Sequence, residues 1–277
     1  MIDRQQGFSL IELMIAITLA LLLMAGAMQF MASSRQTFEL NSDISRIQEN
    51  GRIAMDILVK DLRMAGYRQT LNGDGKAPHY FDFQTHCTRL HTSCTLNQYI
   101  DNTGSITDGS DRLSIQYDPP ANDNGGEARD CLGTKLDATE RHSIIVNVYT
   151  IQTVNGVNSL YCRGYNKSKE KWLERGAQPL IDGIDNMQVL YGVAAATDSS
   201  GSVSQYLSQN ALKESDWPYI KSVSIALLVS NGLKQGFAKA QARKYRLLDS
   251  EELKTAVTDR QARRIYSTTV QLKNNRY

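Results

Sequence analysis

The chain has 277 residues, of which 41% are hydrophobic and 22% charged, and its formal net charge is +2. This length accommodates a membrane anchor and one sizeable domain, and the composition is that of an ordinary globular protein. So small a net charge gives no reason to expect a nucleic-acid partner. Basic residues do gather in Lys234 to Arg246 and in Arg260 to Arg264, where a solvated surface is the simplest expectation.

The N-terminus is polar up to Gly7, and an apolar segment follows from Phe8 to about Met31. About 20 apolar residues span a bilayer as a helix, so residues 8–31 are predicted to be a transmembrane helix. One carboxylate, Glu12, lies near the start of this segment. An unpaired charge at mid-bilayer costs about 2.5–3.5 kcal/mol, so Glu12 is expected to be functional and to have a partner.

The run Gly7-Phe8-Ser9-Leu10-Ile11-Glu12 resembles the N-terminal signal of type IV prepilins and type II secretion pseudopilins. The resemblance implies that residues 1–7 are a leader, that a prepilin peptidase cuts between Gly7 and Phe8, and that the new Phe8 amine is methylated. It also implies that Glu12 pairs with the Phe8 amine of a neighbouring subunit. Burying both charges is tolerable only as such a pair.

An ordinary secretory signal peptide is the alternative interpretation of the same residues. Arg4 supplies a positive charge, Leu13 to Met24 is apolar, and Ala25-Gly26-Ala27 is similar to a cleavage site. A glutamate at position 12 does not belong in the apolar part of such a signal. The helical pattern also continues past residue 27 without a break.

A helical stripe of apolar residues continues beyond the transmembrane segment, in residues 32–66. Its members are Leu40, Ile44, Ile47, Gly51, Ala54, Leu58, Leu62 and Ala65, spaced by three and four. This spacing predicts an amphipathic helix, with polar residues such as Asp43 on the opposite face. Gly66 is expected to end it. One helix is therefore predicted from about Ser9 to Ala65, with its second half packed on a sheet.

Three further runs narrow the resemblance to minor pilins of the PilW type, which are related to the J-type pseudopilins. They are Asp61-Leu62-Arg63-Met64-Ala65-Gly66-Tyr67, Met187-Gln188-Val189-Leu190-Tyr191-Gly192 and Tyr266 to Asn274. The resemblance implies an α+β, type IV pilin-like fold, in which the long helix packs on an antiparallel β-sheet head.

Residues 67–277 are predicted to be that β-rich head. Strands are expected at 113–117, 143–153, 157–162, 184–193, 219–229 and 265–272, from alternating or continuous apolar residues. Asn155-Gly156 between two of them predicts a hairpin, and the most hydrophobic strand, 219–229, is expected to be central. A short helix is expected at Ser250 to Ala256. Residues 68–110 show no clear periodicity.

Four cysteines allow three disulfide connectivities, and disulfides are expected in an exported head. Cys87 and Cys94 are close enough to close a small loop, while Cys131 precedes the predicted hairpin and Cys162 ends it. These positions predict the pairs Cys87–Cys94 and Cys131–Cys162. Zinc at Cys87 and Cys94 with His86 and His91 is the weaker alternative, because no C-x2-C pair is present.

No catalytic motif was found, so the chain is not expected to be an enzyme. Oxygen ligands for calcium occur in two loops, but neither has the spacing of an EF-hand. The loops hold Asp118, Asp123 and Asn124, and Asp198, Ser199 and Ser200. No resident cofactor or metal is predicted; calcium stays the alternative, and an enzyme with a missed site would be a second class of function.

By resemblance, the chain is expected to help prime type IV pilus assembly and to enter the pilus at or near its tip. Its expected partners are the prepilin peptidase, the other minor pilins, the major pilin, the inner-membrane assembly platform and membrane lipid. The N-terminus is expected in the cytoplasm and the head in the periplasm, before transfer to the extracellular pilus. Roles in twitching motility and adhesion would follow. A J-type pseudopilin and a tip adhesin are the alternatives.

Overall fold

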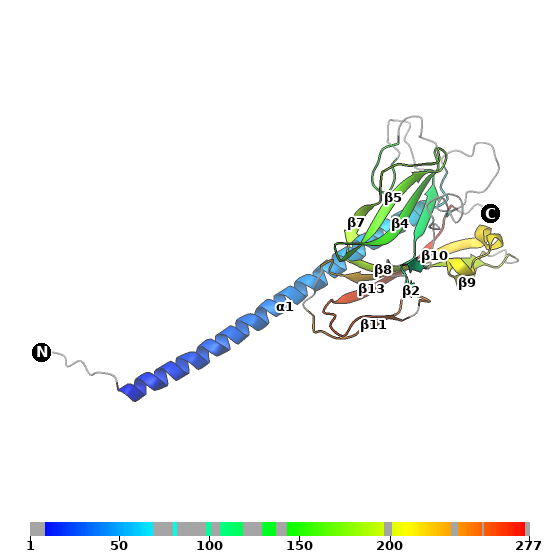
Figure 1. The fold of residues 1–277 in the computed structure, drawn as a ribbon. Helices are drawn as coiled ribbons and strands as arrows, with labels where there is room; N and C mark the ends of the chain where they lie inside the picture. Colours follow the sequence, from blue (N-terminus) through cyan, green and yellow to red (C-terminus); the bar gives the residue numbers. More distant parts are fainter. Residues whose placement is uncertain are drawn as a thin grey trace.

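A long helix, α1, organises the computed structural model (Figure 1). The described residues are 9–68, 80–81, 98–100, 106–118, 129–136, 143–196, 201–233, 238–250 and 252–274. The helix runs from Leu10 to Met64, which confirms the predicted continuous helix. Its C-terminal part lies against the β-rich head, and its N-terminal part projects away from the head (Figure 1).

Two constraints require glycine where α1 ends. Gly66 has a φ of +72°, in the left-handed region that favours glycine. A Cβ atom at this position would also lie 2.5 Å from the Tyr80 ring. The Gly66 N–H donates to the Gln116 carbonyl oxygen at 2.8 Å, which joins the helix end to the first sheet. The predicted stop at Gly66 is confirmed.

The first sheet is antiparallel and contains the predicted hairpin. Its order is β3-β4-β5-β6, and β7 also pairs with β5. The strands are β3 (Leu113–Tyr117), β4 (Ile145–Val154), β5 (Val157–Asn166), β6 (Lys171–Trp172) and β7 (Gln178–Asp182). Asn155 and Gly156 have φ angles of 54° and 78°, as a two-residue hairpin turn between β4 and β5 requires.

The second sheet is also antiparallel, in the order β13-β10-β8-β9. Its strands are β8 (Ile184–Ala194), β9 (Val203–Leu207), β10 (Ile220–Ser230) and β13 (Arg263–Gln271). The interior place of β10 confirms the prediction of a central strand. Short elements complete the described part: β1 (Gln98–Ile100) paired with β2 (Ile106–Asp108), and the 3-10 helices η3 (Gln209–Ala211) and η4 (Glu214–Tyr219).

One core joins α1 to both sheets. The helix contacts β3, β7, β10 and β13, and Leu58 and Leu62 are fully buried in the shared core. Burying one such side chain is worth about 1.5–3 kcal/mol. The packing is closest at Gly51, where a Cβ atom would lie 2.5 Å from the Tyr266 ring of β13. The helix is therefore held rigidly against the head from its middle to its end.

Around Asp43, the burial of the α1 side chains differs from that of the predicted apolar stripe. Ile44, predicted to be buried, is 47% exposed, whereas Asp43, predicted to be on the polar face, is 2% exposed. Position 43 lies four residues before Ile47 and eight before Gly51, on the same helical face. Asp43 can be buried because a side chain of the head supplies a hydrogen bond there.

The segment between β10 and β13 contains a small strand pair, β11 (Lys244–Tyr245) with β12 (Leu253–Lys254). The predicted helix at Ser250 to Ala256 is therefore wrong. The fully buried Leu247 packs with Ala226 and Leu228 of β10, as part of one cluster. Tertiary packing on the outer side of this strand thus holds the segment in an extended form that its local sequence does not indicate.

Candidate functional site

The N-terminal half of α1 is the first candidate site. Its apolar side chains are exposed, and the helix is long and apolar enough to cross a membrane. Ser9 caps the helix, and its Oγ accepts a hydrogen bond from the Glu12 N–H at 3.2 Å. The predicted cleavage and methylation positions, Gly7 and Phe8, lie outside the described residues.

The Glu12 side chain completes the cap by accepting a hydrogen bond from the backbone of Ser9. Its Oε2 accepts a hydrogen bond from the Ser9 N–H at 2.9 Å, so the two residues form a reciprocal capping box. A carboxylate in the first turn also interacts favourably with the positive end of the helix dipole. The cap therefore binds the Glu12 carboxylate to the N–H of Ser9, the residue that follows Phe8 in the sequence; leader cleavage would create the new amine on Phe8.

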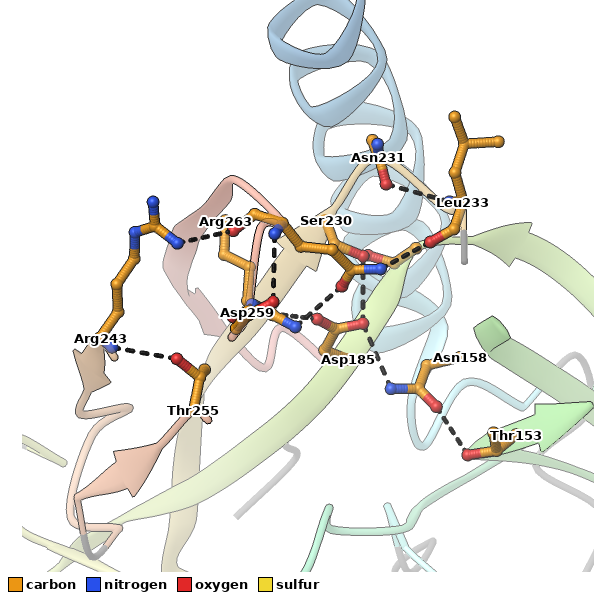
Figure 2. Close-up of polar contacts among 12 residues, drawn as sticks. Thr153, Asn158, Asp185, Ser230, Asn231, Leu233, Arg243, Thr255, Asp259 and Arg263 are labelled. Atoms are coloured by element: carbon orange, nitrogen blue, oxygen red, sulfur yellow. Dashed lines mark hydrogen bonds and ion pairs between the residues drawn. The ribbon is translucent and has the colours of Figure 1, made fainter. Parts of the chain in front are cut away.

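A polar network joins the middle of α1 to the strand ends of the head. Asn231, which follows β10, donates from Nδ2 to Asp43 Oδ1 at 2.8 Å, and both side chains are buried. Asn50 Nδ2 donates to the Asp182 carbonyl oxygen at 2.9 Å. Figure 2 shows Asn231 beside α1, at the end of the head from which the helix leaves it. The network fixes the helix at this end.

Arg263 is the centre of the same network (Figure 2). Its Nε lies 2.5 Å from Asp185 Oδ2, and its Nη1 lies 2.5 Å from Asp259 Oδ2. Burial alone would lower the pKa of Arg263, but the two carboxylates outweigh it and raise this pKa. Asp185 Oδ1 also accepts from Ser230 Oγ at 3.1 Å and from Asn158 Nδ2 at 3.2 Å. The network thus ties β13 to β8, β10 and β5.

A second polar cluster lies where α1 ends. Asp61 Oδ2 accepts from Asn147 Nδ2 at 2.6 Å and from the Tyr149 hydroxyl at 2.5 Å, while Asn147 also donates to the Tyr117 hydroxyl at 2.9 Å. Burial raises the pKa of Asp61, although both hydrogen bonds oppose this. Burial and the Asp61 charge raise the pKa of Tyr149 and of Tyr117. Both tyrosines therefore stay neutral, so that the Tyr149 hydroxyl donates to Asp61 and the Tyr117 hydroxyl accepts from Asn147.

These contacts give the Asp61 to Tyr67 run a structural role. Asp61 bonds the first sheet, Leu62 is fully buried, and Gly66 makes the close turn described above. Asn274, after β13, donates from Nδ2 to the carbonyl oxygens of Arg63 and Ala65, at 3.1 and 3.0 Å. The run therefore joins the helix end to both sheets. Sequence reasoning found it only by resemblance.

Two carboxyl groups, Asp130 and Glu174, lie together beside the first sheet. Asp130 is 7% exposed, and its Oδ1 accepts from the N–H groups of Leu132 and Thr134 at 3.0 and 2.8 Å. No donor among the described residues reaches its Oδ2. Burial and the neighbouring Glu174 raise the pKa of Asp130 to about 7. A protonated Asp130 can donate a hydrogen bond to Glu174.

Cys131, next to Asp130, forms a disulfide with the fully buried Cys162 of β5, with a Cα–Cα distance of 6.4 Å. This is the second of the two predicted pairs. Cys87 and Cys94, which form the other predicted pair, lie outside the described residues, as do His86 and His91 of the zinc alternative.

No group of three or more metal-ligating side chains occurs within the described residues. Of the calcium candidates, Asp118 is buried, and its N–H donates to the Tyr67 carbonyl oxygen at 2.8 Å. The other candidates, Asp123, Asn124 and Asp198 to Ser200, lie outside the described part of the chain. Calcium thus stays the alternative that the sequence leaves open.

Comparisons with known proteins find family matches in both the N-terminal and the C-terminal part of the chain. The family described as Type IV Pilus-assembly protein W matches residues 148–274, and the prokaryotic N-terminal methylation motif matches residues 2–28. These two matches confirm the resemblance to PilW-type minor pilins. The first match covers the whole second sheet, and the second covers the capping box and most of the apolar half of α1.

Among solved structures, the type IV-like pilin TTHA1219 from Thermus thermophilus is similar to the chain. The identity is 13% and the TM-score 0.40, over 83% of this chain and 97% of that one. No curated protein matches the chain. The apolar helix with its methylation motif is consistent with a membrane-anchored pilin.

Proposed function

We propose that this PilW-type chain helps to prime type IV pilus assembly and is incorporated at or near the pilus tip. The observation that carries the proposal is the N-terminal half of α1, which bears Glu12 in its first turn and is not covered by any described part of the head. A subunit of this form offers neighbours an apolar helix with one carboxylate. The family description, Type IV Pilus-assembly protein W, points to the same process.

The proposed assembly contact is a charge pair between subunits. In the bilayer, Glu12 caps its own helix through Ser9. When lipid is replaced by packed helices, its carboxylate meets the methylated Phe8 amine of a neighbour. Charge pairs buried in this way set the register between helices better than they add raw stability. The pair therefore selects one axial position for each subunit.

The proposal includes a path through the cell envelope. The prepilin peptidase removes residues 1–7 at the cytoplasmic face, and α1 anchors the chain in the inner membrane with its head in the periplasm. The assembly platform then transfers the chain, with other minor pilins and the major pilin, to the growing pilus. A basic charge of the N-terminal flank, Arg4, fits a cytoplasmic N-terminus.

The test is the recovery of a Glu12→Ala variant in sheared pili, at membrane levels matched to wild type. The variant should be cleaved after Gly7, insert, and fold its head normally, yet be depleted in the pilus fraction. Glu49→Ala, which removes an exposed carboxylate of α1 beside the head, is the matched control and should be recovered like wild type. Equal recovery of Glu12→Ala would show that this carboxylate does not carry the assembly contact.

Priming is tested separately by deleting the gene and counting surface pili. The deletion should reduce the number of pili, and wild type but not Glu12→Ala should restore it. An unchanged number of pili, with loss of protein secretion instead, would reject priming in favour of a J-type pseudopilin. Normal pili with lost attachment to surfaces would instead favour a tip adhesin.

A further inference from the structure

The positive charge of the chain is concentrated in one segment of the head. Residues 234–264 contain nine of the 31 basic residues and four of the 29 acidic ones, so this segment carries +5 and the rest of the chain −3. We call residues 238–264 the basic segment. The structure describes all of these residues except residue 251. Its exposed cations are Lys239, Lys244, Arg246, Lys254, Arg260 and Arg264.

Hydrogen bonds place both ends of this segment at the end of the head from which α1 leaves. Asp43 is the most N-terminal buried residue of α1, and its partner Asn231 directly follows β10, before the segment begins. At the other end, Arg263 begins β13 and pairs with Asp185. In Figure 1 the segment around β11 lies on the side of the head that faces the N-terminal half of α1.

The helix sets the distance between this end of the head and the bilayer. The apolar part of α1 ends near Met31, and the first buried residue of the helix, Asp43, lies twelve residues later. At 1.5 Å per residue, Asp43 lies about 18 Å beyond the hydrocarbon core. The headgroup layer occupies about 5–8 Å of this distance. About 10–13 Å therefore remain between the headgroup layer and the level of Asp43. The basic segment lies on the side of the head that borders this gap (Figure 1), so its long side chains are placed to extend toward the lipid phosphates.

Hydrogen bonds within the basic segment hold its two ends together. Arg260 Nε donates to the Ala238 carbonyl oxygen at 3.3 Å, and Arg243 Nη2 donates to the Lys239 carbonyl oxygen at 3.0 Å. The contact from Arg260 joins the end of the segment to its beginning. Val257, which lies between Lys254 and Arg260 in the sequence, is 73% exposed. Cations around an exposed apolar side chain suit the interface of a bilayer with anionic lipid.

We propose that the basic segment docks the head on anionic phospholipid headgroups while α1 is in the membrane. The contact orients the head on the bilayer before the subunit is extracted into a pilus. This inference rests on the membrane anchoring in the proposed function. Each cation near an anionic surface raises the ratio of docked to undocked heads about fivefold. Added salt shortens the screening length and therefore removes this attraction.

The experiment uses the full chain in lipid nanodiscs, either of phosphatidylcholine or of phosphatidylcholine with about one third phosphatidylglycerol. Amide hydrogen exchange in residues 238–262 should be slower in the anionic discs. The triple variant Lys239→Gln/Arg260→Gln/Arg264→Gln should lose this difference, and so should wild type in about 0.5 M salt. The control Lys169→Gln/Arg175→Gln/Lys213→Gln removes three exposed cations elsewhere and should keep it.

Equal exchange in the two kinds of disc, or a lipid-dependent difference that survives in the triple variant, would overturn the docking contact. That result leaves the proposed function standing, because the chain is still anchored. Failure of the chain to enter either kind of disc would instead overturn the anchoring, and the docking contact with it.

Discussion

Asn231 and Asp43 are 188 residues apart in sequence, yet the Asn231 amide donates to the Asp43 carboxylate at 2.8 Å in a buried position. Asn231 Oδ1 also accepts from the Leu233 N–H at 3.0 Å, so the amide is held on both sides. Asp43 is the most N-terminal buried residue of α1. The contact therefore fixes the direction in which the helix leaves the head.

Replacing this amide should loosen the helix at that point. Asn231→Ala removes a donor from a buried carboxylate, and we expect the free energy of unfolding to fall by about 1–3 kcal/mol. Urea unfolding in detergent measures the change, and hydrogen exchange near Asp43 should rise. Ser45→Ala, on an exposed position of the same helix, should change stability by less than about 0.5 kcal/mol. Equal effects of the two variants would contradict a role for the amide.

A second prediction concerns the cluster at the end of α1. Asp61→Leu leaves the Asn147 amide without one of its two acceptors and the Tyr149 hydroxyl without its Asp61 acceptor, both in buried positions. We expect a loss of about 2–4 kcal/mol, because hydrogen bonds to charged groups are worth about 1.5–3 kcal/mol. Asp56→Ala is the control. Its side chain is 73% exposed in a long contact with Arg52, so its loss should cost at most about 1 kcal/mol.

The sequence predicts α1 and most strands because each depends on local chemistry. The helix follows from its apolar periodicity and Gly66, and the hairpin follows from Asn155-Gly156, whose backbone angles suit the turn. The short β11–β12 pair was missed because its extended form depends on Leu247 packing on a strand some 20 residues earlier. Periodicity within ten residues carries no information on such a contact.

The third prediction is a pH dependence that originates in Asp130. An aspartate titrates near pH 3.9 in the unfolded chain, whereas burial and Glu174 raise the pKa of Asp130 to about 7 in the folded protein. The folded state therefore binds the proton more tightly. This contribution to stability is complete below about pH 4 and is lost as the pH rises through about 7.

Two variants check this prediction by urea unfolding between pH 4 and pH 8. Asp130→Asn keeps an oxygen for the N–H groups of Leu132 and Thr134 and presents an amide to Glu174, so the decline in stability with rising pH should shrink. Glu174→Gln removes the neighbouring charge and should act in the same direction. A decline as steep as that of wild type in both variants would exclude Asp130 as its source.

The fourth prediction concerns the thiols. The Cys131–Cys162 disulfide spans 31 positions of sequence, and a bridge of this kind is worth about 2–4 kcal/mol. Cys131→Ala/Cys162→Ala should lower the stability of the head by that amount. Non-reducing peptide mapping should also join Cys87 to Cys94. A peptide that links Cys87 to Cys131 or Cys162 would reject the pairing.

Only the local part of the candidate site could be predicted from the sequence. Glu12 and its cap are local, so the motif reveals them without a structure. Asp185, Arg263 and Asp43 come from three distant parts of the chain, and only the packing of strand ends beside α1 brings them together. One weak indication was present: Asp43 lies on the same helical face as Ile47 and Gly51, where a charge has no place unless the head supplies a partner.

The most direct test of a PilW-type pilin is the N-terminus of the protein recovered from membranes and from sheared pili. Mass spectrometry should find a peptide that begins at Phe8 with a methylated amine in both fractions, and Gly7→Val should leave the full-length chain in the membrane alone. A chain that begins at Met28, after Ala25-Gly26-Ala27, would show a secretory signal instead. A Gly7→Val chain of mature mass would contradict cleavage at Gly7 in the same way.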